Sequence, residues 1–257
     1  TALLEHLGSL RAAGRKLLVP YLMGGVPDRH SFSGALRAIA GEADAVEVGL
    51  PFSDPLMDGL VIAAAGERVL RSGLGPLEVL ELASSGAGGS PMVAMTYFNP
   101  VFHVGEAEFC RRAAAAGFAG LIVPDIPVEE SAPLRTAAAD EGLAWVPLVA
   151  PTSPPARVEA IAATATGFVY AVSTLGVTGT RDQLSERAAR VVSACRAATD
   201  LPVLVGIGVS NAEQALAATR TADGVVIGSA VVRLVLERGP EAAGTFVREI
   251  RAALDAR

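Results

Sequence analysis

The sequence predicts an α/β fold, a (β/α)8 TIM barrel with an extra N-terminal helix, and three observations support this prediction. Short apolar runs alternate with amphipathic, Ala-rich stretches along all 257 residues. The alternation occurs about eight times, the number of units that closes a barrel. Hydrophobic residues make up 51% of the chain and aromatic residues only 5%, which is typical of parallel strands covered by small-residue helices. No linker interrupts the series, so residues 1–257 are predicted to form one barrel domain.

The expected elements follow from the periodicity of each stretch. The apolar runs predicted to be strands span residues 17–23, 45–50, 92–97, 120–124, 145–150, 167–172, 203–206 and 224–228. The amphipathic stretches predicted to be helices span residues 31–40, 62–84, 106–116, 130–141, 156–165, 184–198, 212–220 and 241–256. Ahead of them, leucines at helical spacing predict the extra helix: Leu3, Leu4, Leu7 and Leu10.

Charge, cysteine and histidine content limit the classes of function. The net charge is -6 and basic residues are scattered singly, which argues against a nucleic-acid surface. No apolar run approaches the ~18 residues of a membrane helix, so we expect a soluble, cytoplasmic protein. Cys110 and Cys195 lie far apart and are expected to be buried and reduced. The three histidines show no ligand spacing, so no metal is expected.

The stretch 44–59, DAVEVGLPFSDPLMDG, is the strongest candidate site because an apolar strand there carries a carboxylate and runs into an acidic loop. Strand alternation places Ala45, Glu47 and Gly49 on one face. A carboxylate buried in a parallel strand must be paired, hydrogen-bonded or raised in pKa, as proton-transfer groups are. The alternative is a Glu at a frayed strand end. Asp54 and Asp58, which follow in the loop, favour a catalytic site.

Glycine clusters follow the last three expected strands, where a barrel places its active-site loops. They span residues 176–179, 206–210 and 228–230. One such cluster is weak because glycine also ends strands for conformational reasons, but three on consecutive units predict a phosphate site. Tyr97 and Asn99 follow the third strand and Asp125 the fourth. Ligand contact and a capping role remain equally open for Tyr97 and Asp125.

In order along nearly the whole chain, six motifs resemble the tryptophan synthase alpha subunit family: VEVGLPFSDPLMDG, MTYFNPVF, VPDIPVEES, VYAVSTLGVTGT, GIGVSNAEQA and DGVVIGSAVV. The resemblance implies a lyase that cleaves indole-3-glycerol phosphate to indole and glyceraldehyde 3-phosphate by a retro-aldol reaction, without a metal or organic cofactor. It also implies a pyridoxal-phosphate-dependent beta subunit as partner. By motif position, Asp58 accepts the indole N–H and Glu47 is the general acid and base.

The same resemblance assigns the surrounding residues. The phosphate would lie on Gly179, Gly208, Gly228 and Ser229. The indole and glycerol pocket would comprise Tyr21, Ile62, Tyr97, Tyr170, Thr178 and Ile227. A lid would span residues 174–181, with Thr178 bonded to Asp58. The partner-facing loops would include Pro51, Asp54, Asn99 and Pro127.

The chain also departs from the family pattern, chiefly in the loop that faces the partner. Leu60 and Ala63 stand where the family usually has Pro and Gln, Met23 replaces a usual Thr, and Val61 and Val26 also differ. The departures spare both catalytic acids but leave partnering open. The alternatives are a stand-alone lyase that releases free indole and a non-catalytic interaction barrel. A different phosphate-binding barrel would explain the glycines but not the SDP loop.

Overall fold

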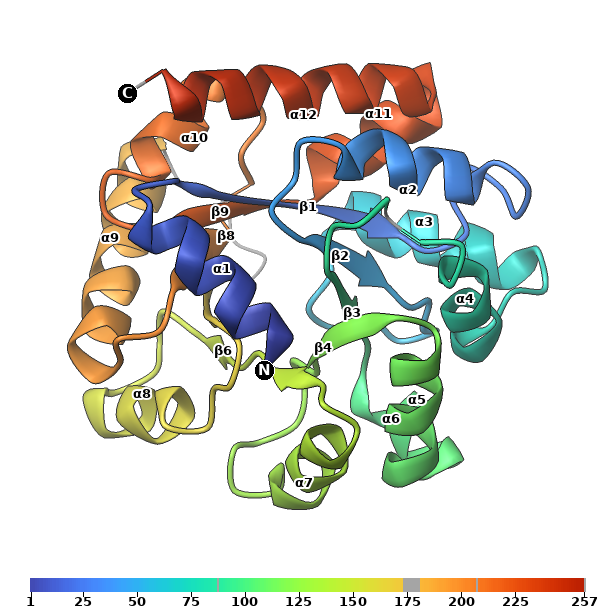
Figure 1. Cartoon of the computed structure of the whole chain (residues 1–257), viewed down its shortest axis with the longest axis horizontal. Helices are drawn as coiled ribbons and strands as arrows, with labels where there is room; N and C mark the ends of the chain where they lie inside the picture. Colours follow the sequence, from blue (N-terminus) through green and yellow to red (C-terminus); the bar gives the residue numbers. More distant parts are fainter. Residues whose placement is uncertain (87, 173–180, 207, 257) are drawn as a thin grey trace.

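The computed structural model describes residues 1–86, 88–172, 181–206 and 208–256, with the side chains of residues 181–185 left undescribed. In this part of the chain, nine parallel strand segments form one sheet in the order β5-β4-β3-β2-β1-β9-β8-β7-β6. The terminal segments, β5 (Ala144–Trp145) and β6 (Leu148–Val149), are consecutive pieces of one stretch of chain. The sheet therefore closes on itself, and helices surround it (Figure 1). The predicted barrel is confirmed.

The remaining elements alternate as the periodicity predicts. The other strands are β1 (Leu17–Met23), β2 (Val46–Gly49), β3 (Met92–Met95), β4 (Phe118–Ile122), β7 (Val169–Val172), β8 (Val203–Gly206) and β9 (Gly224–Ile227). The helices are α1 (Ala2–Ala12), α2 (Phe32–Ala40), α3 (Leu60–Arg71), α4 (Pro76–Ala83), α5 (Phe98–Val104), α6 (Glu106–Ala115), α7 (Ala132–Asp140), α8 (Pro155–Ala162), α9 (Arg181–Ala198), α10 (Ala212–Ala218), α11 (Ser229–Arg238) and α12 (Pro240–Asp255). Among the described residues, no helix has the length and apolar character needed to cross a membrane.

The inside of the barrel is filled by side chains that alternate inward along the strands. Leu17, Val19, Ala45 and Val226 belong to this interior cluster. Leu3 and Leu7 of α1 join it from one end, so the predicted extra helix closes the N-terminal end of the barrel (Figure 1). This arrangement leaves the C-terminal ends of the strands for the site.

Two expected elements differ from the structure, and two helices were not expected. The expected helix 62–84 is two helices, α3 and α4, because Gly73 takes a φ of +85° and Pro76 starts the second helix. The expected strand 145–150 is interrupted before Leu148, where Pro147 has no N–H to donate. Helices α5 and α11 were not predicted. Only two residues separate α5 from β3 and one separates α11 from β9, so no long loop lies between either helix and its strand.

Candidate active site

Glu47 of β2 lies on the same face as Ala45, and because Ala45 belongs to the interior cluster, Glu47 points into the barrel. It pairs in register with Tyr21 of β1 and Val93 of β3, and only 1% of its surface is exposed. Burial, together with the smaller effect of the negative charge of Asp58, raises the pKa of Glu47 to about 8. Its Oε2 has no hydrogen-bond partner among the described residues. The side chain is therefore largely protonated at neutral pH and holds a transferable proton.

Asp58 lies at the end of the loop after β2, next to the residue that caps α3. Burial raises the pKa of Asp58 to about 6, and a hydrogen bond from the Tyr97 hydroxyl opposes this rise. The same hydroxyl accepts the Met57 N–H at 3.0 Å, and the Tyr97 ring stacks on Phe52 at 5.2 Å. Tyr97 thus holds both ends of the loop, a role that its motif position alone did not indicate. At neutral pH the site pairs a protonated carboxyl with an ionised one.

Two tyrosines of the predicted pocket rest on glycines in neighbouring strands. A Cβ added to Gly49 would overlap the Tyr21 hydroxyl, and one added to Gly206 would overlap the Tyr170 hydroxyl. Burial raises the pKa of both tyrosines, so both stay neutral. Gly49 and Gly206 were not predicted to contact these rings. In register, Gly49 pairs with Met23 and Gly206 with Val172, each two residues beyond the tyrosine that it contacts.

The described phosphate candidates lie at two of the predicted strand ends. Gly228 precedes α11, Ser229 is the first residue of that helix, and the helix N-terminus presents unpaired N–H groups. A Cβ on Gly228 would lie 3.3 Å from Ile62 Cδ1, so the backbone approaches the pocket closely there. Gly208 has a φ of +67°, a left-handed conformation that favours glycine. Gly179 and Thr178, like residues 174–180 of the expected lid, lie outside the described residues.

Ile227 was expected to line the pocket, but its side chain points away from it. It is fully buried and belongs to the outer cluster with Val225, whereas Val226 belongs to the interior cluster. The reason is the strand period of two, which turns Ile227 toward the helices. Ile62 of α3, by contrast, is partly buried and lies next to Gly228.

The predicted partner-facing residues differ in their exposure. Asp54, Asn99 and Pro127 are exposed, but Pro51 is buried and offers no free surface. Asp125 accepts the N–H of Phe98 at 2.8 Å and so caps the start of α5. This cap is on α5 and not on the turn before Pro127 that was the expected alternative to ligand contact. No group of three or more His, Cys, Asp or Glu in the described residues is arranged to hold a metal ion.

Comparison with known proteins identifies the family. A sequence profile described as tryptophan synthase alpha chain matches residues 7–254. The tryptophan synthase alpha chain of Streptomyces avermitilis is 47% identical over 243 residues, covering 93% of this chain and 88% of the relative. That of Microcystis aeruginosa is 41% identical and covers 99% of each chain.

Solved structures agree with the sequence relatives. A structure of Mycobacterium tuberculosis tryptophan synthase superimposes with a TM-score of 0.92 at 39% identity, covering 99% of this chain and 98% of the other. The tryptophan synthase A-subunit of Pyrococcus furiosus gives a TM-score of 0.84 at 34% identity, covering 93% and 98%. The chain therefore belongs to the tryptophan synthase alpha chain family, the carbon–carbon lyases of tryptophan biosynthesis that cleave indole-3-glycerol phosphate to indole and glyceraldehyde 3-phosphate.

Proposed function

We propose that Glu47 and Asp58 divide the proton transfers of this cleavage between them. Protonated Glu47 donates its proton to indole C3, while the Asp58 carboxylate accepts the indole N–H and stabilises the positive charge that develops on the ring. The Glu47 carboxylate then removes the proton of the side-chain hydroxyl next to the ring. The electrons of that O–H bond form the aldehyde, and those of the carbon–carbon bond restore indole. The opposite ionisation states of the two carboxyls at neutral pH carry this proposal.

The substrate is held at its other end by backbone amides. The phosphate would lie at the N-terminus of α11, on Gly228 and Ser229, with Gly208 nearby from the preceding unit. Tyr21, Tyr170 and Ile62 would contact the organic part. In the sheet only β1 lies between β2, which carries Glu47, and β9, which precedes Gly228, so the anion and the acids would lie close together at the barrel mouth.

Replacement of the acid tests the assignment. Glu47→Gln keeps the shape of the side chain but cannot exchange a proton, so we expect kcat to fall by about 10²-fold or more while glycerol phosphate still binds. The matched control is Glu42→Gln, an exposed carboxylate in the turn before the same strand. A Glu47→Gln variant that keeps a normal kcat would overturn the role of Glu47.

We also propose that a pyridoxal-phosphate-dependent beta subunit covers the loop after β2. Four large apolar side chains are exposed on this loop and on α3 and α5: Leu56 at 87%, Met57 at 39%, Leu60 at 91% and Phe102 at 70%. The Met57 N–H donates to Tyr97, just before α5, so the two segments are adjacent. An exposed apolar group of this kind is typical of a protein interface.

Leu60 and Ala63 are the departures that bear on this partner. Leu60 is the first residue of α3, where Pro is favoured, and the preceding Gly59 has φ and ψ of -72° and 163°, which suit a following Pro. We therefore expect Leu60→Pro with Ala63→Gln to fold normally and to couple more strongly to a beta subunit. The measurement is kcat with and without beta for both forms. Strong activation of the unaltered chain, or no gain in the variant, contradicts weakened coupling.

The second candidate is a stand-alone lyase, favoured only by these two departures. If the chain alone turns over indole-3-glycerol phosphate rapidly and beta adds nothing, the stand-alone function is correct. No turnover in either condition would instead support a non-catalytic barrel.

Both cysteines, Cys110 and Cys195, are buried and free, which supports the reducing environment of the cytoplasm.

A further inference from the structure

The barrel wall has a seam where it closes. β5 pairs with β4, whereas β6 pairs with β7. The Val146 N–H donates to Leu121 O at 3.0 Å. After this bond, β6 pairs with β7 and not with β4 in the described sheet. The chain after β4 and the chain of β6 therefore separate toward the C-terminal end of the barrel.

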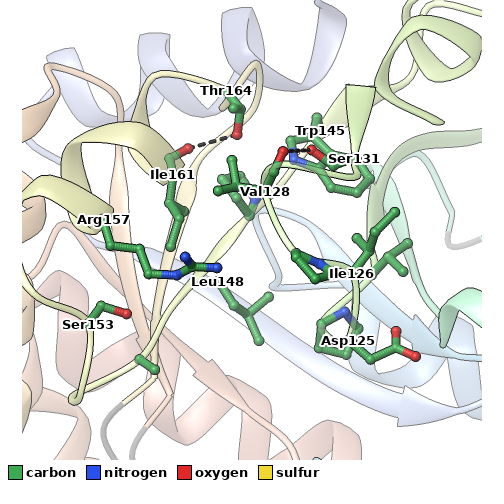
Figure 2. A pocket seen from close by; sticks show the side chains of 15 residues that line it. Asp125, Ile126, Val128, Ser131, Trp145, Leu148, Ser153, Arg157, Ile161 and Thr164 are labelled. Carbon is green, nitrogen blue, oxygen red and sulfur yellow. Dashed lines mark hydrogen bonds between the residues drawn. The ribbon is translucent and has the colours of Figure 1, made fainter. Parts of the chain in front are cut away.

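A cavity of about 270 Å³ lies in this seam, between the loop before α7 and the start of α8 (Figure 2). Its apolar lining includes Val128, Trp145, Leu148 and Ile161. An engineered apolar cavity of about 150 Å³ is large enough to bind benzene, so this space can hold a substituted aromatic ring. It includes neither Glu47 nor any described phosphate candidate.

Most of the polar side-chain groups that face the centre of the cavity are donors. The hydroxyls of Ser131 and Thr164 already donate to Val128 O and Ile161 O. The Asp125 carboxylate points away from the centre of the cavity (Figure 2). This leaves two uncharged donors, the Ser153 hydroxyl and the indole N–H of Trp145, together with the Arg157 guanidinium, whose partner Glu129 is not part of the lining.

Arg157 and Trp145 give the cavity its chemical character. Arg157 extends over the cavity, its side chain is 43% exposed, and it pairs with Glu129 at 3.0 and 3.3 Å. Trp145 is 4% exposed, and its indole N–H takes part in none of the hydrogen bonds among the described residues. A cation and an unpaired donor beside an apolar wall match a ligand with one anionic group and one ring.

We propose that the seam cavity is a second small-molecule site, which binds aromatic carboxylates with the ring against Trp145 and Ile161 and the carboxylate at Arg157. Leu148 lines the cavity and pairs in register with Tyr170 of the substrate pocket. A ligand in the seam therefore contacts the wall of the catalytic site without occupying it.

Trp145 makes the site directly observable because it is the only tryptophan in the chain. Titration of the full chain with benzoate is expected to change tryptophan emission saturably, with calorimetry as an independent measure of binding. Saturating glycerol phosphate should leave the benzoate affinity unchanged. Benzyl alcohol and acetate, which each lack one of the two recognised groups, should bind about tenfold more weakly or worse.

Two matched variants test the role of the cation. Arg157→Gln should weaken benzoate binding about tenfold or more, whereas Glu129→Gln frees Arg157 from its partner and should keep or increase the affinity. Both side chains are exposed, so neither change should alter the fold. Equal benzoate affinity in Arg157→Gln, competition by glycerol phosphate, or no heat of binding to the unaltered chain would each overturn the proposal.

Discussion

The local environment of a carboxyl group decides its chemical role at this site. Glu47 is enclosed in the barrel and gains no hydrogen bond at Oε2 from the described residues, so burial raises its pKa to about 8. Asp58 is less deeply placed, and the Tyr97 hydroxyl stabilises its charge, so its pKa is about 6. A donor and an acceptor therefore coexist near pH 7.

The pH dependence of kcat/KM should show both groups. We expect activity to rise as Asp58 ionises near pH 6 and to fall as Glu47 loses its proton near pH 8, with the two apparent values belonging to the coupled pair. Tyr97→Phe removes the hydrogen bond that lowers the pKa of Asp58, so the acidic limb should move to higher pH. Tyr170→Phe is the control and should leave that limb in place. If the acidic limb of the kcat/KM profile stays at the same pH in Tyr97→Phe, the tyrosine does not act through Asp58.

Stability should also depend on the protonation of Glu47. Its pKa is raised in the folded state from 4.5 to about 8, so the folded chain holds a proton that the unfolded chain has lost between these values. The stabilisation is complete below about pH 4.5 and is lost as pH rises through 8. Glu47→Gln cannot titrate, so its free energy of unfolding should fall less over this range, by an amount on the order of a few kcal/mol. Urea titrations at several pH values measure this, and parallel curves for the two proteins would contradict it.

At the scale of elements, the strand ends and helix starts position the substrate groups. α11 follows β9 directly, so the first turn of the helix faces the barrel mouth. Gly228 lies at this junction, close to Ile62 and Tyr21. A side chain there would enter the space between the helix N-terminus and the pocket.

Gly228→Val should therefore weaken glycerol phosphate binding, by about tenfold or more, because the added side chain separates the anion from the N–H groups of α11. Gly34→Val is the control, since a Cβ at Gly34 in α2 meets no atom within 4 Å. Calorimetry gives the affinity and circular dichroism the fold. Unchanged affinity in a folded Gly228→Val protein would mean that this glycine only forms the turn.

At the scale of the whole molecule, buried charges connect distant parts of the chain at the N-terminal end of the barrel. Asp44, just before β2, accepts the Leu18 N–H at 2.8 Å, Arg15 Nε at 2.6 Å and Arg251 Nη1 at 3.1 Å. Arg251 comes from α12, which packs against α2 and α11 (Figure 1). Asp44 and Arg251 are each 3% exposed. They join the first two strands to the last helix.

Asp44→Asn should destabilise the protein by about 3 kcal/mol or more, because it leaves the buried Arg251 without its buried counter-charge. The activity of the folded fraction should not change, since the site is at the other end of the barrel. Glu67→Gln, which removes an exposed pair with Arg71, is the control and should have little effect. Chemical denaturation measures both, and equal effects would show that burial adds nothing to the Asp44 interaction.

The sequence by itself determined the number and order of the βα units and the inward direction of Glu47. These properties depend on local periodicity, which each stretch carries independently of the others. The outward direction of Ile227 was available from the same alternation. The break between α3 and α4 could likewise be read from Gly73 and Pro76.

Only the tertiary structure decided the properties that depend on distant residues. The pKa values of Glu47 and Asp58 result from burial by other elements, and the contact of Tyr97 with Met57 spans 40 positions of the chain. The seam appears only because β5 and β6 pair with different neighbours. Sequence periodicity specifies which face of an element is buried. Closure of the barrel specifies which buried residues contact one another, and the chemistry of the site depends on those contacts.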